Sequence, residues 1–259
     1  MPNNEIMTAD PTKRFTDRVD NYVKYRPDYP VEVITYLQHE CGLTDKSVIA
    51  DVGAGTGIFT GLLLNKGYKV YAVEPNDAML QAAIGQFAGN TQFEPVNGTA
   101  EATTLLAQSV DMIVCAQAFH WFNEQKTAVE FKRILKPGGK VALIWNNRLP
   151  DVDDFSKAYE SLLKHDGIDY NKVNHRNIGE INFKGFFKDG EYTVTKFPNA
   201  QTFDLEGLFG RAFSSSYVPQ QDTEAGQKFK GLLKDIFDRY NSDGKVSFHY
   251  QTEIYLGEV

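Results

Sequence analysis

Two hydrophobic periodicities alternate along the middle of the chain. Short, mostly apolar runs lie at 48–52, 70–73, 111–115 and 141–145, and between them apolar residues recur three or four positions apart, as over 80–87. A short continuous run is typical of a strand buried on both faces, and the wider spacing is typical of an amphipathic helix. The alternation therefore predicts βαβ units, that is, an α/β fold with a doubly wound, mostly parallel sheet and helices on both faces.

The segments that flank this middle part show further helices and a different kind of strand. Pro30 precedes a helical pattern over 31–41, and helical spacing returns at 155–163 and 229–240. Over 246–256 apolar and polar residues alternate, which predicts a half-buried antiparallel strand near the C-terminus.

The end of one predicted helix is marked by helix-breaking residues. The helix expected between the runs at 111–115 and 141–145 has Ala128, Phe131 and Leu135 on one side. The Lys-Pro-Gly-Gly sequence at 136–139 follows directly, and proline and glycine are strong helix breakers. We therefore expect this helix to end at residue 136, in a turn that leads to the next strand.

Composition and charge narrow the class of protein. Hydrophobic residues make up 42% and charged residues 24%, which is ordinary for a globular domain. The 27 Lys and Arg against 34 Asp and Glu give a net charge of −7, so the chain lacks the basic surface that nucleic acid requires, and an anionic membrane would repel it. No secretory leader or apolar run of ~20 residues is visible. Cys41 and Cys115 form no metal-spaced pair, so we expect a cytoplasmic protein without a metal site.

A glycine-rich turn joins the first strand to the first helix after it. Asp51 lies near the end of the strand, and Gly53-Ala-Gly-Thr-Gly57 leads into the helix. Glycines allow a sharp turn and the close approach of a ligand to the main chain. The dinucleotide fingerprint G-x-G-x-x-G would place glycine at position 58, where this chain has Ile58. The pattern therefore suits a ligand without phosphates, whose ammonium group Asp51 attracts.

A second acid follows the neighbouring strand. Glu74 lies directly after the run at 70–73, where a carboxylate can accept both hydroxyls of a ribose and would repel a 2′-phosphate. The alternative is that Asp51 and Glu74 are solvated strand ends. The glycine turn, the helix after it and the spaced acid together favour a nucleoside site.

Five segments together resemble the class I S-adenosylmethionine-dependent methyltransferases. They are VIADVGAGTG at 48–57, VYAVEPN at 70–76, GTAEA at 98–102, VDMIVCAQAFHWF at 110–122 and LKPGGKVAL at 135–143. Their order and spacing match the family over about 45–147. The N-terminal residues Tyr22, Tyr25, Arg26, Pro27 and Tyr29, with His120-Trp121-Phe122, further resemble the small-molecule branch that includes the trans-aconitate methyltransferases.

The resemblance implies a seven-stranded Rossmann-like sheet and S-adenosylmethionine as the cofactor. It assigns Asp51 and the glycines to the methionine end of the cofactor, Glu74 to the ribose, and the loop at 99–101 to the adenine edge. Many relatives have aspartate where this chain has Thr99, so a hydroxyl would accept the hydrogen bond of the adenine amine. The residues expected to bind the cofactor are Tyr22, Arg26, Asp51, Gly53, Ala54, Gly55, Thr56, Gly57, Glu74, Pro75, Asn76, Met79, Thr99, Ala100, Glu101, Ala116 and Gln117.

Tyr22 and Arg26 form a distinctive pair in that set. They are four positions apart, so they share a face if the segment is helical, and Pro27 ends such a helix. An arginine fork can bind a carboxylate of the cofactor or of the acceptor, and a tyrosine ring can lie against the sulfonium. A surface salt bridge with a packed aromatic ring is the alternative.

The acceptor is expected beyond the strand at 111–115. We hypothesise that His120 is the catalytic residue, which orients or deprotonates the acceptor, and that Trp121 and Phe122 exclude water; the alternative is a structural histidine. Asn146 and Arg148 follow the next strand and are also expected to bind the acceptor. The acceptor is a small molecule, and the resemblance favours a carboxylic acid.

Two weaker candidates for attracting an acid lie further along the chain. They are Arg211 and the Ser-Ser-Ser-Tyr run at 214–217. A polar loop needs no ligand in order to exist, so neither signal is specific.

The chain is read as a single methyltransferase domain over 1–259, as a monomer or homodimer. Its parts are an N-terminal helical cap over the cofactor at 1–44, the cofactor-binding core at 45–147, a helical insertion near the acceptor site at 148–190, and C-terminal strands and helices at 191–259. Two other functions stay open: a nicotinamide-dependent oxidoreductase and a catalytically inactive cofactor-binding protein. Fold alone does not choose between them.

Overall fold

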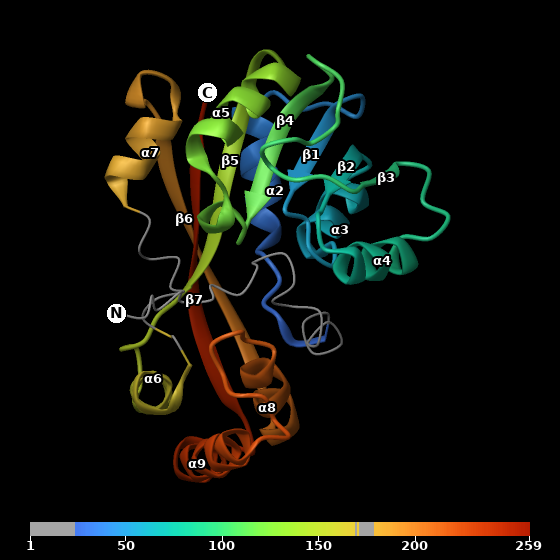
Figure 1. Cartoon of the computed structure of the whole chain (residues 1–259). Coiled ribbons are helices and arrows are strands. Elements are labelled where there is room, and N and C mark those ends of the chain that lie inside the picture. The colour runs from blue at the N-terminus through green and yellow to red at the C-terminus, as the bar shows by residue number, and fades with distance from the viewer. Residues whose placement is uncertain (1–23, 169, 171–178) are drawn as a thin grey trace, which may run out of the picture.

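One seven-stranded sheet organises the molecule, and its strand order is β3-β2-β1-β4-β5-β7-β6 (Figure 1). The computed structural model describes residues 24–168, 170 and 179–259. The strands are β1 Val48–Val52, β2 Lys69–Val73, β3 Phe93–Val96, β4 Val110–Ala116, β5 Leu135–Arg148, β6 Thr193–Phe203 and β7 Val246–Gly257.

The five strands from β3 to β5 are parallel, and β7 is antiparallel to both of its neighbours, β5 and β6. This confirms the predicted mostly parallel sheet with an antiparallel C-terminal strand. The chain order reverses between β1 and β4, and in open sheets of this kind ligands bind at that point, beyond the carboxyl ends of the strands.

Helices cover both faces of the sheet, as the alternating pattern predicts. Helices α2 (Val31–Glu40) and α3 (Ile58–Asn65) pack on one face, where they share an apolar cluster with the strands. Helices α5 (Glu124–Ile134) and α7 (Glu180–Phe186) pack on the other face around a second cluster. Helix α4 (Asp77–Gln86) follows β2.

The antiparallel pair of β6 and β7 extends past the parallel strands and carries a third group of helices (Figure 1). Helices α6 (Asp154–Asp166), α8 (Leu205–Phe213) and α9 (Glu224–Tyr240) form an apolar cluster with the extended part of β7. Helices α6 and α7 of the 148–190 segment therefore belong to different clusters, one at each end of the β6–β7 pair.

The expected end of the helix before β5 is wrong. Helix α5 ends at Ile134, and Leu135 already pairs with Val110 as the first residue of β5. The register shifts between Val110 and Met112, and Gly138 has a φ of +77°. The Lys-Pro-Gly-Gly sequence is thus a bulge inside a strand rather than a turn before it. Glycine and proline mark both features, so the sequence alone does not distinguish them.

Two strands lack an apolar signal strong enough to predict them. Strand β3 is the four-residue sequence FEPV, and β6 alternates between exposed and half-buried residues along an edge of the sheet. Among the helices of the described part of the chain, none is long and apolar enough to cross a membrane.

Candidate functional site

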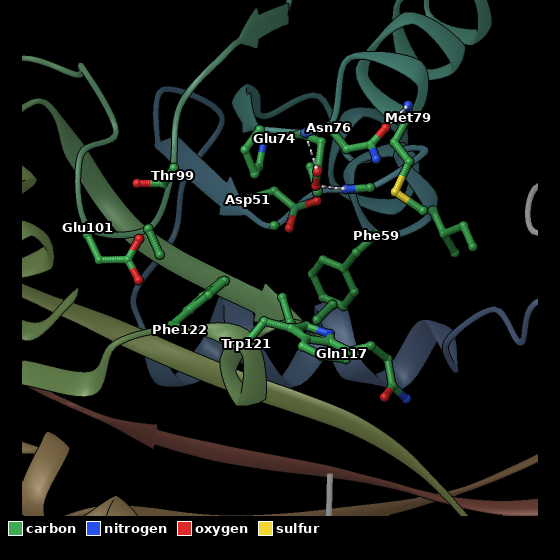
Figure 2. A pocket seen from close by; sticks show the side chains of 18 of the residues that line it. Asp51, Phe59, Glu74, Asn76, Met79, Thr99, Glu101, Gln117, Trp121 and Phe122 are labelled. Carbon is green, nitrogen blue, oxygen red and sulfur yellow. Dashed lines mark hydrogen bonds between the residues drawn. The ribbon is translucent and has the colours of Figure 1, made fainter. Parts of the chain in front are cut away.

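A cavity of about 200 Å³ lies at the carboxyl ends of β1, β2 and β4, at the point where the strand order reverses (Figure 2). Its lining residues come from the ends of β1 and β4, from the loops around them and from the starts of α3 and α4. They are Tyr29, Asp51, Gly53, Ala54, Gly55, Ile58, Phe59, Glu74, Pro75, Asn76, Met79, Thr99, Ala100, Glu101, Ala116, Gln117, Ala118, Trp121 and Phe122.

Asp51 is the most deeply buried acid of this cavity. Its exposed fraction is 0%, and its Oδ2 accepts a hydrogen bond of 2.6 Å from the hydroxyl of Thr60. Its Oδ1 has no hydrogen-bond partner among the described residues. Burial raises the pKa of the carboxyl to about 7, and the nearby charge of Glu74 adds to the effect. A cationic donor placed against Oδ1 would stabilise the charged form of Asp51.

Glu74 is held by the backbone so that both of its oxygens keep acceptor capacity. Oε2 accepts from the amide of Gly55 and Oε1 from the amide of Asn76, each at 2.9 Å. Burial raises the pKa of this carboxyl, and the two amide hydrogen bonds oppose that rise. A carboxylate offers about four lone-pair positions, so each oxygen retains one for a further donor. This geometry suits a vicinal diol.

Four amides of the glycine turn, those of residues 53, 54, 55 and 57, already donate to groups of the protein. The amides of Gly53 and Ala54 both donate to the carbonyl of Val73, at 2.8 and 3.1 Å. The next two hydrogen bonds run from Gly55 to Glu74 at 2.9 Å and from Gly57 to Ala54 at 2.9 Å. A phosphate-binding loop keeps such amides free for its anion. This turn therefore supports a ligand without phosphates.

Glycine is required at position 53 by two features of the structure. The residue has a φ of +74°, which L side chains rarely adopt. A Cβ built on it would lie 2.5 Å from the Cβ of Ala118 and 3.2 Å from the ring of Phe122. The turn after β1 thus passes close to the turn after β4, and the two form one wall of the cavity.

The opposite end of the cavity is a short loop fixed at two places. Thr99 and Ala102 exchange backbone hydrogen bonds of 3.3 and 3.2 Å, so Ala100 and Glu101 lie at the tip of the loop. The Oε1 of Glu101 accepts from the amide of Asn123 at 2.8 Å. In Figure 2, Thr99 and Glu101 lie on the side of the cavity opposite Met79.

Gln117 has a strained backbone at the edge of the cavity. Its φ is +57°, and its amide donates to the carbonyl of Ile144 at 2.8 Å. Non-glycine residues in the left-handed region cost energy and concentrate at functional sites. The strain turns the chain after β4 toward the cavity rather than along the sheet.

Most of the predicted site residues line this one cavity, but six described ones do not. Thr56 is buried within the glycine turn, and Gly57 is the N-cap of α3. The Nη2 atom of Arg26 donates to the carbonyl of Ser214 at 3.0 Å, away from the cavity lining. His120, Asn146 and Arg148 are described below. Tyr22 lies outside the described residues.

His120 lies beside the cavity but does not line it. Its ring is 4.8 Å from that of Trp121, and its Nδ1 is 3.5 Å from the indole nitrogen of Trp145. Trp121 and Phe122, the next two residues, do line the cavity. The histidine therefore contacts a residue that lines the cavity without lining it itself.

The two predicted acceptor residues on β5 are buried in polar contacts. The Asn146 side chain donates to the carbonyl of Asp28 at 3.2 Å. Arg148 forms an ion pair with Glu160 of α6, and its guanidinium lies 4.9 Å from the ring centre of Tyr159. The ion-pair partner of Arg148 thus comes from the insertion after β5, and the sequence of β5 alone does not predict it.

Four residues of the cavity escaped the prediction: Tyr29, Ile58, Phe59 and Ala118. Tyr29 belongs to the N-terminal motif, and its ring packs edge-on against Phe59 at 5.0 Å. Tyr29 belongs to the N-terminal tyrosine motif and Ala118 to the segment at 110–122, so the sequence could have indicated both residues. Ile58 and Phe59 read only as the first apolar residues of a helix. No group of three or more possible metal ligands occurs among the described residues.

Comparison with known proteins identifies relatives of this fold and sequence. Residues 50–143 match a family model described as a methyltransferase domain. An uncharacterized methyltransferase-like protein of Schizosaccharomyces pombe is 28% identical over 250 residues, 95% of each chain. An uncharacterized methyltransferase of Mycobacterium tuberculosis is 37% identical over 134 residues, 52% of each chain. The structure of a putative type II methyltransferase from Anaeromyxobacter dehalogenans superposes with a TM-score of 0.66 at 18% identity, covering 90% of this chain and 98% of that chain.

Proposed function

We propose that this chain is a class I S-adenosylmethionine-dependent methyltransferase, which transfers a methyl group from that cofactor to a small-molecule acceptor, with a carboxylic acid as the favoured class. The unpaired Oδ1 of the buried Asp51 carries the cofactor assignment. S-Adenosylmethionine has an ammonium group and no phosphate, and both properties match this part of the cavity.

The residues of the cavity fit the three parts of this cofactor. Asp51 would bind its ammonium group, and the acceptor positions left on Glu74 would bind the two ribose hydroxyls. The loop of Thr99 to Glu101, with Met79 on the opposite side, would enclose the adenine. A nicotinamide dinucleotide fits less well, because its pyrophosphate would meet committed amides and the side chain of Ile58 at the start of α3.

The protein contributes mainly orientation and exclusion of water. When bound, the cofactor supplies an electrophilic methyl group on a positively charged sulfur. Correct orientation of reactants contributes on the order of 7–11 kcal/mol to such reactions. Trp121 and Phe122 provide apolar surface beside Gln117, at the end of β4. An anionic acceptor that loses water against these rings would react faster, because its charge is neutralised in the reaction.

The binding experiment compares S-adenosylhomocysteine with NAD by calorimetry and thermal shift. We expect the purified protein to bind S-adenosylhomocysteine and to ignore NAD. An extract supplied with isotopically labelled methyl donor should then yield a labelled product that identifies the acceptor. Cofactor binding without any labelled product would favour the catalytically inactive alternative, and binding of NAD alone would favour the oxidoreductase.

Replacing Glu74 with glutamine is expected to weaken S-adenosylhomocysteine binding by on the order of 10- to 100-fold. The amide keeps one acceptor oxygen and replaces the other by a donor, which faces either the amide of Gly55 or a ribose hydroxyl. Calorimetry measures the change. Glu94→Gln, at an exposed position of β3, is the matched control and should bind as the wild type does. Equal affinity in both variants would remove Glu74 from the site.

Replacing His120 with alanine separates the two interpretations of that residue. If His120 orients or deprotonates the acceptor, turnover falls on the order of 100-fold or more, while affinity for S-adenosylhomocysteine changes little because the ring does not line the cavity. His39→Ala, at an exposed position of α2, is the control. Unchanged turnover of the acceptor found in the extract assay would assign His120 a packing role beside Trp121 and Trp145.

A further inference from the structure

A band of polar side chains crosses one face of the sheet between two apolar clusters. On β7, Ile254 and Leu256 belong to the cluster under α2 and α3, whereas Val246 and Phe248 belong to the cluster of α6, α8 and α9. Between them on the same face lie Tyr250 and Thr252, whose partners on β5 are the polar residues Arg148 and Asn146. On β6, Asn199 pairs with Tyr250, and Gln201 accepts a hydrogen bond from the Tyr250 hydroxyl. The polar band consists of Asn146, Arg148, Asn199, Gln201, Tyr250 and Thr252.

The polar band begins at the rim of the cofactor cavity. Gln117 lines the cavity, and its side-chain amide donates to the carbonyl of Asn146 at 3.4 Å. The segment at 25–29 crosses the band: the carbonyl of Asp28 accepts from Asn146 and from Asn199, at 3.2 and 2.7 Å. The next residue, Tyr29, lines the cavity. One segment of chain therefore covers both the band and the cavity edge.

At its far end the band meets a buried arginine from α8. Arg211 is 6% exposed, and its guanidinium donates to the hydroxyl of Tyr250 at 3.2 Å and to that of Ser215 at 3.0 Å. Arg148, on the same face, is neutralised by Glu160. Within the described residues, Arg211 has only uncharged hydrogen-bond partners and no ion pair. A buried charge without a counter-charge is costly, so its presence requires an explanation.

Arg211 is one of three arginines whose charges act on the hydroxyl of Tyr217. Although burial alone would raise it, the charges of Arg211, Arg26 and Arg148 lower the pKa of the Tyr217 hydroxyl. Arg211 has the largest effect of the three, and that of Arg148 is offset by its ion pair with Glu160, in a chain whose net charge is −7. A positive region inside an acidic protein attracts an anion to this place in preference to the outer surface.

We propose that Arg211 binds a carboxylate of the methyl acceptor, and that Tyr250 and Ser215 hold its guanidinium in position. This inference rests on the proposed methyl transfer and names the residue that selects the acceptor. The planar guanidinium matches a carboxylate with two parallel hydrogen bonds. Tyr250 lies opposite Arg148, two residues along β5 from Asn146, which is roughly 7 Å of strand. In this proposal the carboxylate on Arg211 anchors the acceptor, and a different group of the acceptor receives the methyl group.

The test is calorimetry on the full chain saturated with S-adenosylhomocysteine. The probes are succinate, glutarate and trans-aconitate, each compared with its full methyl ester. We expect wild type to bind at least one acid and none of the esters. Arg211→Gln should weaken acid binding at least tenfold, and Arg211→Lys should restore part of it. Arg239→Gln, at an exposed position of α9, is the control and should change nothing. Affinity for S-adenosylhomocysteine should stay within about twofold throughout.

Several outcomes would overturn the inference while leaving methyl transfer intact. Wild type that binds S-adenosylhomocysteine but no acid, or Arg211→Gln that binds acids as tightly as wild type, excludes Arg211 as the anchor. If Arg211→Gln does not fold, the Tyr250→Phe variant tests whether Arg211 binds the acid. It removes only the hydroxyl that accepts from Arg211 and should weaken acid binding at least threefold; unchanged binding rejects the inference. Wild type that fails to bind S-adenosylhomocysteine rejects the proposed function itself.

Discussion

Replacing Asp51 with asparagine is expected to reduce affinity for S-adenosylhomocysteine on the order of 100-fold while leaving the fold intact. The substitution keeps the shape of the side chain and its hydrogen bond with Thr60, but removes the charge that would face the ligand ammonium. The cost is large because the carboxylate is fully buried and no solvent screens the interaction. Calorimetry on the purified variant measures the loss.

The pH dependence provides an independent test of the same residue. Burial raises the pKa of the Asp51 carboxyl to about 7 in the ligand-free protein, so binding near pH 6 must first remove a proton. Affinity is therefore expected to rise about tenfold between pH 6 and pH 8, and this rise should be absent in Asp51→Asn.

Stability should respond in the opposite direction. Because the folded-state pKa is above the ordinary value of 3.8, the native protein holds a proton that the unfolded chain releases between about pH 4 and pH 7. The contribution of Asp51 to stability is thus present below that window and is lost as pH rises through about 7. Without ligand, Asp51→Asn should be at least as stable as wild type at pH 8.

Asp111→Asn is the matched control for these measurements. Asp111 lies near the start of β4, where it accepts from the amide of Val48 and pairs with Lys136. Its replacement costs stability at the amino end of the sheet but touches nothing in the cavity. An equal loss of cofactor affinity in both variants would show that the effect of Asp51 is only structural.

The sequence predicts the parts of this site that depend on local backbone geometry. Asp51, the glycine turn and Glu74 follow two buried parallel strands, and strand ends that share an edge bring such residues together wherever the strands pair. The β1 strand and the α9 helix were likewise predictable, because a continuous or strongly amphipathic apolar pattern leaves few alternatives.

The unpredicted parts depend on contacts between distant segments. Arg148 has the sequence context of an exposed strand end, yet α6 places Glu160 against it, and only the tertiary fold shows that pair. Arg211 lies on an ordinary amphipathic helix, and its burial follows from the β6–β7 extension that carries the helix. Strand β6 itself is half-exposed, so it lacks the apolar run from which buried strands are recognised.

Replacing Gly53 with alanine is expected to cost about 1–3 kcal/mol of unfolding free energy through the clash alone, and to abolish measurable S-adenosylhomocysteine binding. The new Cβ would lie 2.5 Å from that of Ala118, so the turns after β1 and β4 must move apart, and both line the cavity. Thermal or denaturant unfolding and calorimetry measure the two effects.

Gly67→Ala is the matched control because it isolates the backbone contribution. Gly67 has a φ of +86°, close to the +74° of Gly53, and its Cβ would meet no atom within 4 Å. It should therefore cost about 1 kcal/mol from the left-handed conformation and leave ligand affinity unchanged. The difference between the two variants measures the close approach of the two turns. Equal stability losses and equal affinities would mean that position 53 needs glycine only for its backbone angles, and that the cavity wall tolerates a larger residue there.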